Sequence, residues 1–224
     1  MKQVAVREAA VRIPPDGLSG DLSIPDNAEG VVLFAHGSGS SRRSERNRHV
    51  AAMLQQGGLA TLLMDLLTEE EEQIDIETRH LRFDIDLLAR RLMDATAWLS
   101  RSQDTRHLHA GYFGASTGGG AALVAAAALP GEIGAVVSRG GRPDLAGDAL
   151  PRVRAPVLLI VGGHDYPVIE MNESALARIQ SEARLEIVPG ATHLFEEPGT
   201  LDEVARMALR WFQRYLPNQH ASGQ

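Results

Sequence analysis

The stretch Gly111-Tyr112-Phe113-Gly114-Ala115-Ser116-Thr117-Gly118-Gly119-Gly120-Ala121-Ala122 is the most informative part of the chain. It joins an apolar run typical of a buried strand to an alanine-rich run typical of a helix, and it contains G-x-S-x-G at Gly114, Ser116 and Gly118. A strand that turns abruptly into a helix forces strained backbone angles on the residue at the bend, and glycines beside it relieve the crowding. We therefore expect the Ser116 hydroxyl to stand at the carboxyl edge of a parallel sheet.

The rest of the chain repeats this alternation of strand and helix. Apolar runs typical of strands buried on both faces occur at Val31–Ala35, Ala60–Met64, Leu108–Phe113, Ala135–Val137, Val157–Val161 and Leu185–Val188. Helical patterns lie between them, and the longest places apolar residues every three or four positions from 81 to 99. Repeated strand–helix–strand units predict a mainly parallel sheet with helices on both faces. Gln3–Pro25, which is broken by a proline-rich turn, predicts a few short antiparallel strands.

Three other segments are interpreted from local signals. Asn47–Gln56 is predicted to be a helix that ends at two glycines, and Leu201–Tyr215 is predicted to be the last helix. The acidic run Glu69–Glu72 follows a predicted strand, and we interpret it as a solvated loop. The alternative is that this run, which lies near the carboxyl edge, repels anionic substrates or tethers Arg139 and Arg142.

Composition limits the class of protein. The hydrophobic share of 44% and charged share of 23% are those of a soluble globular chain, so we expect one domain over residues 1–216 and a flexible tail over 217–224. A net charge of −7 argues against nucleic acid as the main partner. The absence of cysteine excludes disulfides and a thiol nucleophile. No signal-like or membrane-spanning run is present in the sequence, so we expect a cytoplasmic protein without a membrane partner.

A serine needs a base before it can act as a nucleophile, and His193 is the candidate. It lies in Ala191-Thr192-His193, between the last predicted strand and the last helix, on the same sheet edge as Ser116. Asp165, in Gly162-Gly163-His164-Asp165, follows the preceding strand and would orient the imidazole. The alternatives are a surface histidine in a loop and an aspartate that caps the next helix. The chain order Ser, Asp, His favours a catalytic triad.

Acyl transfer also needs N–H donors for the oxyanion. We expect these to be the backbone N–H groups of Thr117 and Ser38, with Gly39 beside them as a possible substrate contact. Arg139 and Arg142 follow another predicted strand at the same edge, where either would bind a substrate carboxylate or, as we favour, pair with a carboxylate of the protein. His36 is interpreted as a structural residue beneath the loop that contains Ser38.

Together, His36-Gly37-Ser38-Gly39, Gly114-Ala115-Ser116-Thr117-Gly118, Gly163-His164-Asp165 and Ala191-Thr192-His193 resemble the α/β-hydrolase superfamily, in particular its dienelactone-hydrolase-like branch. The resemblance implies a three-layer α/β/α sandwich with a mainly parallel sheet of about eight strands and no cap domain. It also implies triad chemistry on a small ester or acyl substrate without a cofactor. Dienelactone hydrolases proper have a cysteine as nucleophile; since this chain has Ser116, a serine carboxylesterase is expected. We expect a monomer or homodimer.

Three alternatives compete with this interpretation. Residues 37–42 form a glycine-rich loop between a strand and a helix, which resembles a nucleotide-binding loop, but Arg42 stands where a third glycine is expected. A non-hydrolytic nucleotide-binding protein is therefore the alternative function. His107 and His109 share a strand face without an acidic partner nearby, so no metal site is predicted. A fold without catalysis would leave the filled triad positions unexplained.

Overall fold

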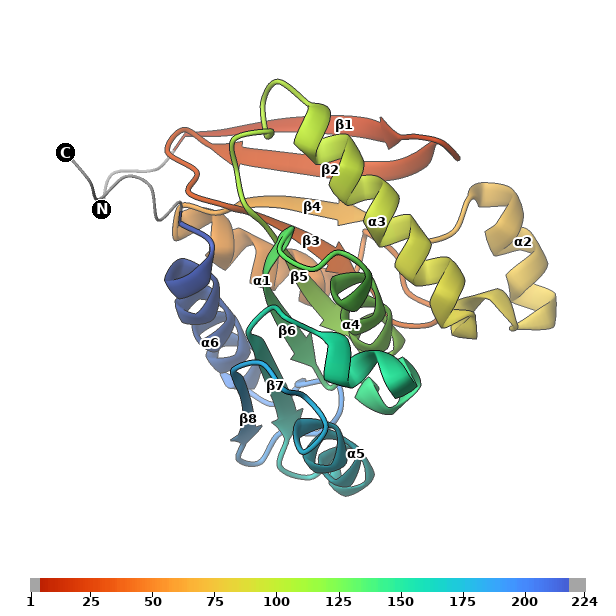
Figure 1. Cartoon of the computed structure of the whole chain (residues 1–224), viewed down its shortest axis with the longest axis vertical. Coiled ribbons are helices and arrows are strands. Elements are labelled where there is room, and N and C mark those ends of the chain that lie inside the picture. Colours follow the sequence, from red (N-terminus) through yellow and green to blue (C-terminus); the bar gives the residue numbers. More distant parts are fainter. Residues whose placement is uncertain (1–4, 218–224) are drawn as a thin grey trace.

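The fold is organised around one eight-stranded sheet (Figure 1). The computed structural model describes residues 5–217, so most of the expected tail, residues 218–224, lies outside the described part. The strands lie in the order β1-β2-β4-β3-β5-β6-β7-β8. Their bounds are β1 Val6–Ile13, β2 Leu18–Pro25, β3 Val31–Ala35, β4 Ala60–Met64, β5 Ala110–Ala115, β6 Ile133–Arg139, β7 Val157–Gly162 and β8 Ala183–Val188. β2 pairs antiparallel with β1 and β4, and all the other pairs are parallel.

The predicted strands are all present: β3 and β4 have the predicted bounds, whereas β5, β6, β7 and β8 differ from the prediction at their ends. Every residue of β3, β4, β5 and β7 is buried, as continuous apolar runs predict for strands covered on both faces. β6 extends beyond Ala135–Val137 because Ser138 and Arg139 still pair with both neighbouring strands. A prediction from hydrophobicity ends the strand before its first polar residue, whereas the backbone hydrogen bonds of the strand continue past that residue.

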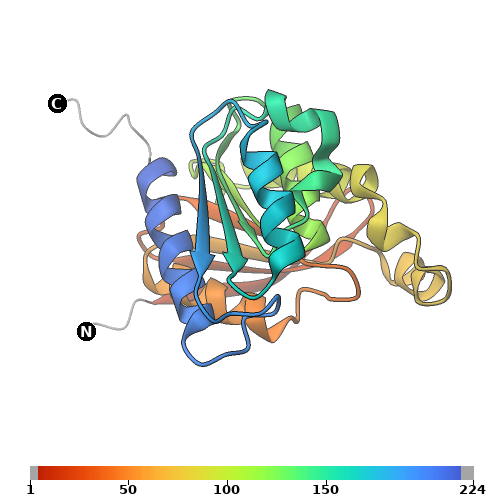
Figure 2. The same ribbon diagram turned by 90° about the horizontal axis from the view of Figure 1, so that it is seen from below.

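Helices cover both faces of the sheet, which confirms the three-layer α/β/α sandwich (Figure 2). α1 (Glu45–Gln56) and α6 (Thr200–Tyr215) pack on one face. α3 (Ile85–Arg101), α4 (Thr117–Ala128), α5 (Tyr166–Leu176) and the 3₁₀ segment η2 (Pro143–Arg152) pack on the other. Within residues 5–217 no cap domain covers the carboxyl edge of the sheet.

The acidic run differs from its interpretation as a loop. Glu69 begins helix α2 (Glu69–Thr78), which is followed by the short 3₁₀ segment η1 (Leu81–Phe83). Thr68 accepts a hydrogen bond from the N–H of Glu71, and the Glu71 carboxylate accepts one from the N–H of Thr68. This capping box, with carboxylates in the first turn, explains why a strongly charged segment is helical.

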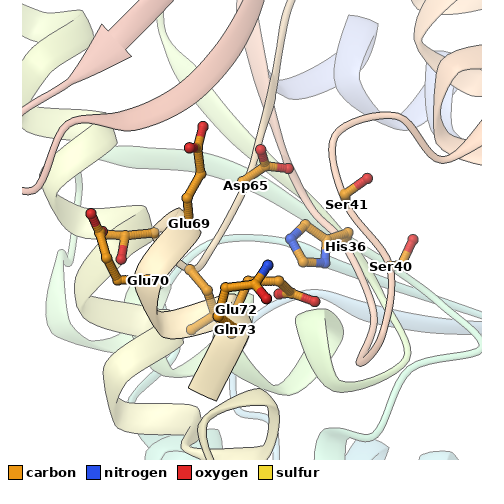
Figure 3. Close-up of a pocket in the computed structure, with 10 residues that line it drawn as sticks. His36, Ser40, Ser41, Asp65, Glu69, Glu70, Glu72 and Gln73 are labelled. Carbon is orange, nitrogen blue, oxygen red and sulfur yellow. The ribbon is translucent and has the colours of Figure 1, made fainter. Parts of the chain in front are cut away.

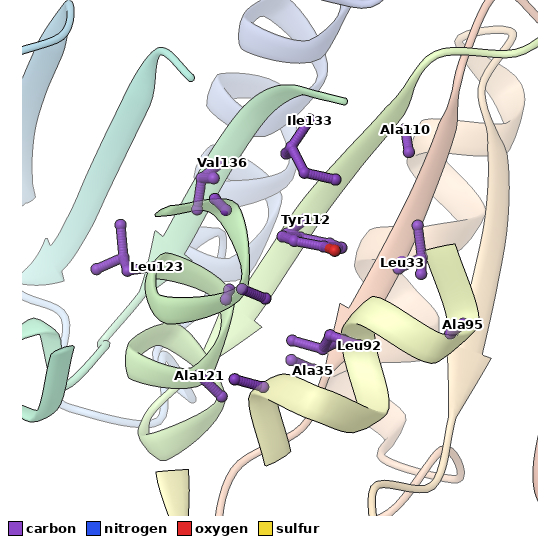
Figure 4. Close-up of a cluster of buried hydrophobic side chains, with 14 of the residues drawn as sticks. Leu33, Ala35, Leu92, Ala95, Ala110, Tyr112, Ala121, Leu123, Ile133 and Val136 are labelled. Carbon is purple, nitrogen blue, oxygen red and sulfur yellow. The ribbon is translucent and has the colours of Figure 1, made fainter. Parts of the chain in front are cut away.

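Tyr112 of β5 lies in the buried hydrophobic cluster that also includes side chains of α3 (Figure 4), and its phenol makes a buried hydrogen bond there. Tyr112 is fully buried, and its phenol oxygen lies 2.7 Å from Oγ1 of Thr96. The same threonine hydroxyl donates to the carbonyl of Leu92 at 2.9 Å, so the phenol donates to Thr96. Burial raises the pKa of Tyr112, so the phenol keeps its proton.

The loss of stability expected on removing Thr96 from this bond differs from the loss expected on removing the Tyr112 hydroxyl. Thr96→Val leaves the Tyr112 hydroxyl buried without an acceptor and should lower the free energy of unfolding by about 1–3 kcal/mol. Tyr112→Phe leaves the Thr96 hydroxyl bonded to Leu92 and should cost only about 0.5–1.5 kcal/mol. Urea denaturation followed by circular dichroism measures both. A larger loss in Tyr112→Phe than in Thr96→Val would contradict this assignment of donor and acceptor.

Candidate active site

Ser116 occupies a strained turn between β5 and α4. Its φ of 51° and ψ of −122° lie in a region that side-chain-bearing residues rarely adopt. The glycines on either side are required by close approach, since a Cβ on Gly118 would lie 2.2 Å from the carbonyl oxygen of Ala35 and one on Gly114 would lie 2.5 Å from that of Gly118. The expectation that glycines make room for this bend is therefore confirmed.

Hydrogen bonds of the backbone hold this turn from β6. The N–H of Ser116 donates to the carbonyl of Arg139 at 3.3 Å, and the N–H of Arg142 donates to the carbonyl of Ser116 at 3.0 Å. The Ser116 side chain does not cap helix α4. It lies instead against Gly37, where a Cβ would be 3.1 Å from the Cβ of Ser116 and 3.8 Å from its Oγ. The loop after β3 therefore lies directly against the nucleophile candidate.

His36 anchors that loop to the end of β4. It is buried, its Nε2 accepts a hydrogen bond from the N–H of Leu66 at 3.1 Å, and its Nδ1 lies 3.0 Å from the carbonyl of Gly37. Since Nε2 is an acceptor, the proton of the neutral ring is on Nδ1. Burial is the main cause that lowers the pKa of His36. The interpretation of His36 as structural is confirmed.

A second anchor was not foreseen. Asp65 accepts a hydrogen bond from the N–H of Arg42 at 2.8 Å and an ion pair from its guanidinium. The position of Asp65 at the end of a buried parallel strand was the available signal, because side chains there meet the loops of the same edge.

Among residues 5–217, neither the N–H of Ser38 nor that of Thr117 has a hydrogen-bond acceptor, so both remain available to a ligand.

Asp165 and His193 meet as their positions predicted. Nδ1 of His193 lies 2.6 Å from Oδ2 of Asp165, although the two residues are 28 positions apart in the chain. Asp165 stands at the start of α5 but its side chain does not cap that helix. Its carboxylate is mostly buried, with 13% of the side chain exposed, against 36% for His193.

The loop that contains His193 is itself held by a carboxylate. Glu197 accepts hydrogen bonds from the hydroxyl of Thr192 at 2.7 Å and from its N–H at 3.1 Å. These bonds, the hydroxyl first, lower the pKa of Glu197. No pattern in the sequence singled out this residue, because a glutamate four positions after a histidine in a loop is unremarkable.

Ser116 and His193 both contact the turn at the end of β6, Ser116 at Arg139 and His193 at Gly140. A Cβ on Gly140 would lie 3.5 Å from two ring atoms of His193, and the preceding carbonyl, of Arg139, accepts the N–H of Ser116. In the described part of the chain no hydrogen bond joins Ser116 Oγ to the His193 ring. Serine, histidine and aspartate thus emerge at one sheet edge, from the ends of β5, β8 and β7.

The other candidate residues have different surroundings. The guanidinium of Arg142 donates to both oxygens of Asp144, at 2.8 and 2.7 Å, so the favoured pairing with a protein carboxylate holds for this arginine. Gly39 has a φ of 69°, and a Cβ there would lie 3.4 Å from a guanidinium nitrogen of Arg82. Arg139 is buried, and among the described residues it has no carboxylate partner.

An acidic cavity of about 550 Å³ opens beside the loop after β3 (Figure 3). Its wall includes His36 and the acidic side chains Asp65, Glu69, Glu70 and Glu72. The remaining carboxylate of the run, that of Glu71, does not line this cavity and pairs with Arg91 at 2.7 Å. The acidic run therefore holds an arginine, but neither of the two at the carboxyl edge of β6.

Two further searches of the described residues gave negative results. Within residues 5–217, no group of three or more histidine, cysteine, aspartate or glutamate side chains is arranged to hold a metal ion. In the same part of the chain, every helix is too short or too polar to cross a bilayer.

Comparison with known proteins places this geometry in a family. The model of the Dienelactone hydrolase family matches residues 18–217. A crystal structure of a dienelactone hydrolase from Anabaena variabilis is 64% identical, with a TM-score of 0.92, and the match covers 96% of this chain and 99% of that one. Est1E from Butyrivibrio proteoclasticus shares the fold at 16% identity, with a TM-score of 0.72 over 91% of this chain and 99% of its own.

Curated relatives carry a different name. Two proteins from strains of Mycobacterium tuberculosis, each named "Putative phosphoribosyl transferase", are 56% identical to this chain over 216 residues. The match covers 96% of this chain but 48% of each relative, so the chain spans about half the length of the curated relatives it matches. The family match, which covers most of the chain, supports a hydrolase with an α/β-hydrolase fold. The chain belongs to the dienelactone hydrolase family.

Proposed function

We propose that this protein is a serine hydrolase of the carboxylesterase type, in which Ser116 is the nucleophile, His193 the general base and Asp165 the residue that orients it. The observation that carries the proposal is the 2.6 Å contact between Asp165 and His193, whose ring lies against Gly140, directly after the Arg139 carbonyl that accepts the N–H of Ser116. Because Asp165 engages Nδ1, the Nε2 atom of the ring is left to accept a proton.

In the proposed reaction, Nε2 of His193 takes the proton from Ser116 Oγ as this oxygen bonds to the carbonyl carbon of an ester. The backbone N–H groups of Thr117 and Ser38 stabilise the oxyanion of the tetrahedral intermediate, and His193 then returns the proton to the leaving alcohol. Water repeats the sequence on the acyl-enzyme, with His193 as base, and releases the carboxylic acid. This chemistry requires no cofactor.

The competing functions have less support. The 37–42 loop that resembles a nucleotide-binding loop lies against Ser116, and its Arg42 is occupied by Asp65. The transferase name belongs to proteins about twice as long as this chain, so it does not assign phosphoribosyl transfer to the matched half. A small ester or acyl compound remains the proposed substrate. A cytoplasmic location and a monomeric or homodimeric state remain predictions.

The nucleophile is tested by Ser116→Ala. Hydrolysis of p-nitrophenyl acetate should fall by roughly 10³-fold or more, because only oxyanion stabilisation and binding would remain. The wild type should also be labelled by a fluorophosphonate probe, and peptide mapping should place the label on Ser116.

Ser174→Ala, an exposed serine on α5, is the matched control and should keep both activity and labelling. If Ser116→Ala retains the wild-type rate, or if the probe modifies a different serine, Ser116 is not the nucleophile.

The anchor at His36 predicts an acid-sensitive fold. The folded chain holds this ring neutral, whereas the unfolded chain protonates it below about pH 6.5. The stabilising contribution is thus complete above that pH and is lost as the pH falls from there toward the lowered pKa of the folded state. In His36→Asn, whose amide oxygen still accepts from Leu66, the free energy of unfolding should depend less steeply on pH, by about 1.4 kcal/mol per pH unit in this window.

Urea denaturation at a series of pH values from 5 to 8 compares the two proteins, and the comparison cancels the other histidines. Parallel slopes for wild type and His36→Asn would mean that His36 is protonated equally in the folded and unfolded chains.

A further inference from the structure

Arg139 is the last residue of β6 and lies between the elements that contain Ser116 and His193. In the sheet it pairs with Ala115, which precedes Ser116, and with Ile160 of β7. Ala135 and Val137, on the same side of the strand by its period of two, pack in the core beneath α1 and α6. The guanidinium lies on that side, 5.8 Å from the centre of the Phe195 ring in the His193 loop.

The charge of Arg139 is buried without a counter-charge. Only 6% of the residue is exposed, and among residues 5–217 its Nε has no hydrogen-bond partner and no carboxylate forms an ion pair with it. Burial first, and the nearby charge of Arg46 second, lower the pKa of Arg139 to about 10. Removing a cation from water without a partner is among the most costly arrangements in a folded protein.

Arg46, near the start of α1, adds a second cation to the same place. Its Nε is also buried without a partner, and its terminal nitrogen lies 3.6 Å from the largely exposed carboxylate of Glu196. Beside it, Oδ1 of the buried Asn47 has no partner either. Two guanidinium groups thus approach each other where α1 and the His193 loop meet.

Three other arginines near the carboxyl edge are each paired with a carboxylate. Arg42 pairs with Asp65, Arg82 with Asp75 and Arg142 with Asp144. Arg139 is more deeply buried than any of these three, yet it is the one without a carboxylate among the described residues. Within the part of the chain that the structure describes, Arg139 therefore lacks the carboxylate partner that each of the other three arginines has.

We propose that Arg139 and Arg46 form a buried binding site for a small carboxylate or similar oxyanion, located beneath the His193 loop. The anion is either a free one or the carboxylate of the ester substrate, in which case the site selects anionic esters; this second source rests on the function proposed above. Guanidinium groups suit the task, because their planar donors match the two oxygens of a carboxylate.

Thermal unfolding tests the site without any use of catalysis. In a low-salt zwitterionic buffer, sodium formate or acetate should raise the melting temperature of the wild type, by roughly 5–10 °C at about one hundred times the dissociation constant. Arg139→Met should show no such rise and should be at least as stable as the wild type without the anion, since an uncompensated buried charge has been removed. Arg46→Met should weaken the response and provides a second variant should Arg139→Met fail to fold.

Arg43→Gln is the matched control, because it removes one charge from an exposed arginine three positions before Arg46. It should respond to the anion as the wild type does. A wild type that formate and acetate do not stabilise, or an equal rise in wild type and Arg139→Met, overturns the anion site.

Paired substrates distinguish the two sources of the anion. Mono-p-nitrophenyl glutarate has a free carboxylate at the end of its acyl chain, whereas p-nitrophenyl pentanoate has the same chain length without it. If the substrate supplies the anion, Arg139→Met should lower the ratio of kcat/KM for the anionic over the neutral ester by roughly 10–100-fold. An unchanged ratio together with a thermal response identifies a free anion.

The two proposals fail separately. If the fluorophosphonate probe does not label Ser116, the esterase proposal fails, yet the thermal response still decides the anion site. If Ser116 is labelled but neither the melting temperature nor the substrate ratio depends on Arg139, the anion site alone is rejected.

Discussion

The strained backbone at Ser116 is the constraint on which the rest of the site depends. A residue with these angles costs of the order of 1–3 kcal/mol and persists only where its surroundings over-determine it. Here the surroundings are backbone: the carbonyl of Arg139, the N–H of Arg142 and the close passage of Gly118 beneath β3. Because β5 lies between β3 and β6 in the sheet, the position of the hydroxyl is set by contacts with both neighbouring strands.

The loops that surround Ser116 lack that rigidity and are held by polar contacts instead. His36 and the Arg42–Asp65 pair attach the loop after β3 to the end of β4. The contact between Thr192 and Glu197 closes the loop that contains His193. Each contact joins groups that approach from different strand ends, so the sheet determines which loops meet and the polar contacts determine their spacing. The geometry of the candidate site thus depends on buried or half-buried hydrogen bonds a few residues away from Ser116 and His193.

The sequence predicts the layers of the fold and the meeting of Asp165 with His193, because both follow from strand order and apolar runs. It does not predict helix α2, since its capping box outweighs a composition typical of loops. It also leaves Arg139 ambiguous. Whether an arginine at a strand end reaches a carboxylate depends on the face it occupies and on the neighbours across the sheet, and only coordinates supply these. The pairing of Arg142 with Asp144 could be predicted from the sequence, because the two residues are only two positions apart.

Opposite charges lie on the two sides of Ser116. Carboxylates gather on the side of β4 and α2, where they line the acidic cavity, while the uncompensated guanidinium of Arg139 lies on the side of β6 and the His193 loop. A substrate with a carboxylate would be repelled at one end of this arrangement and attracted at the other, so a single orientation would be favoured. A neutral ester would feel neither force. In the proposed site the anion offsets the cost of keeping Arg139 buried, a cost that a neutral residue of the same volume would not have.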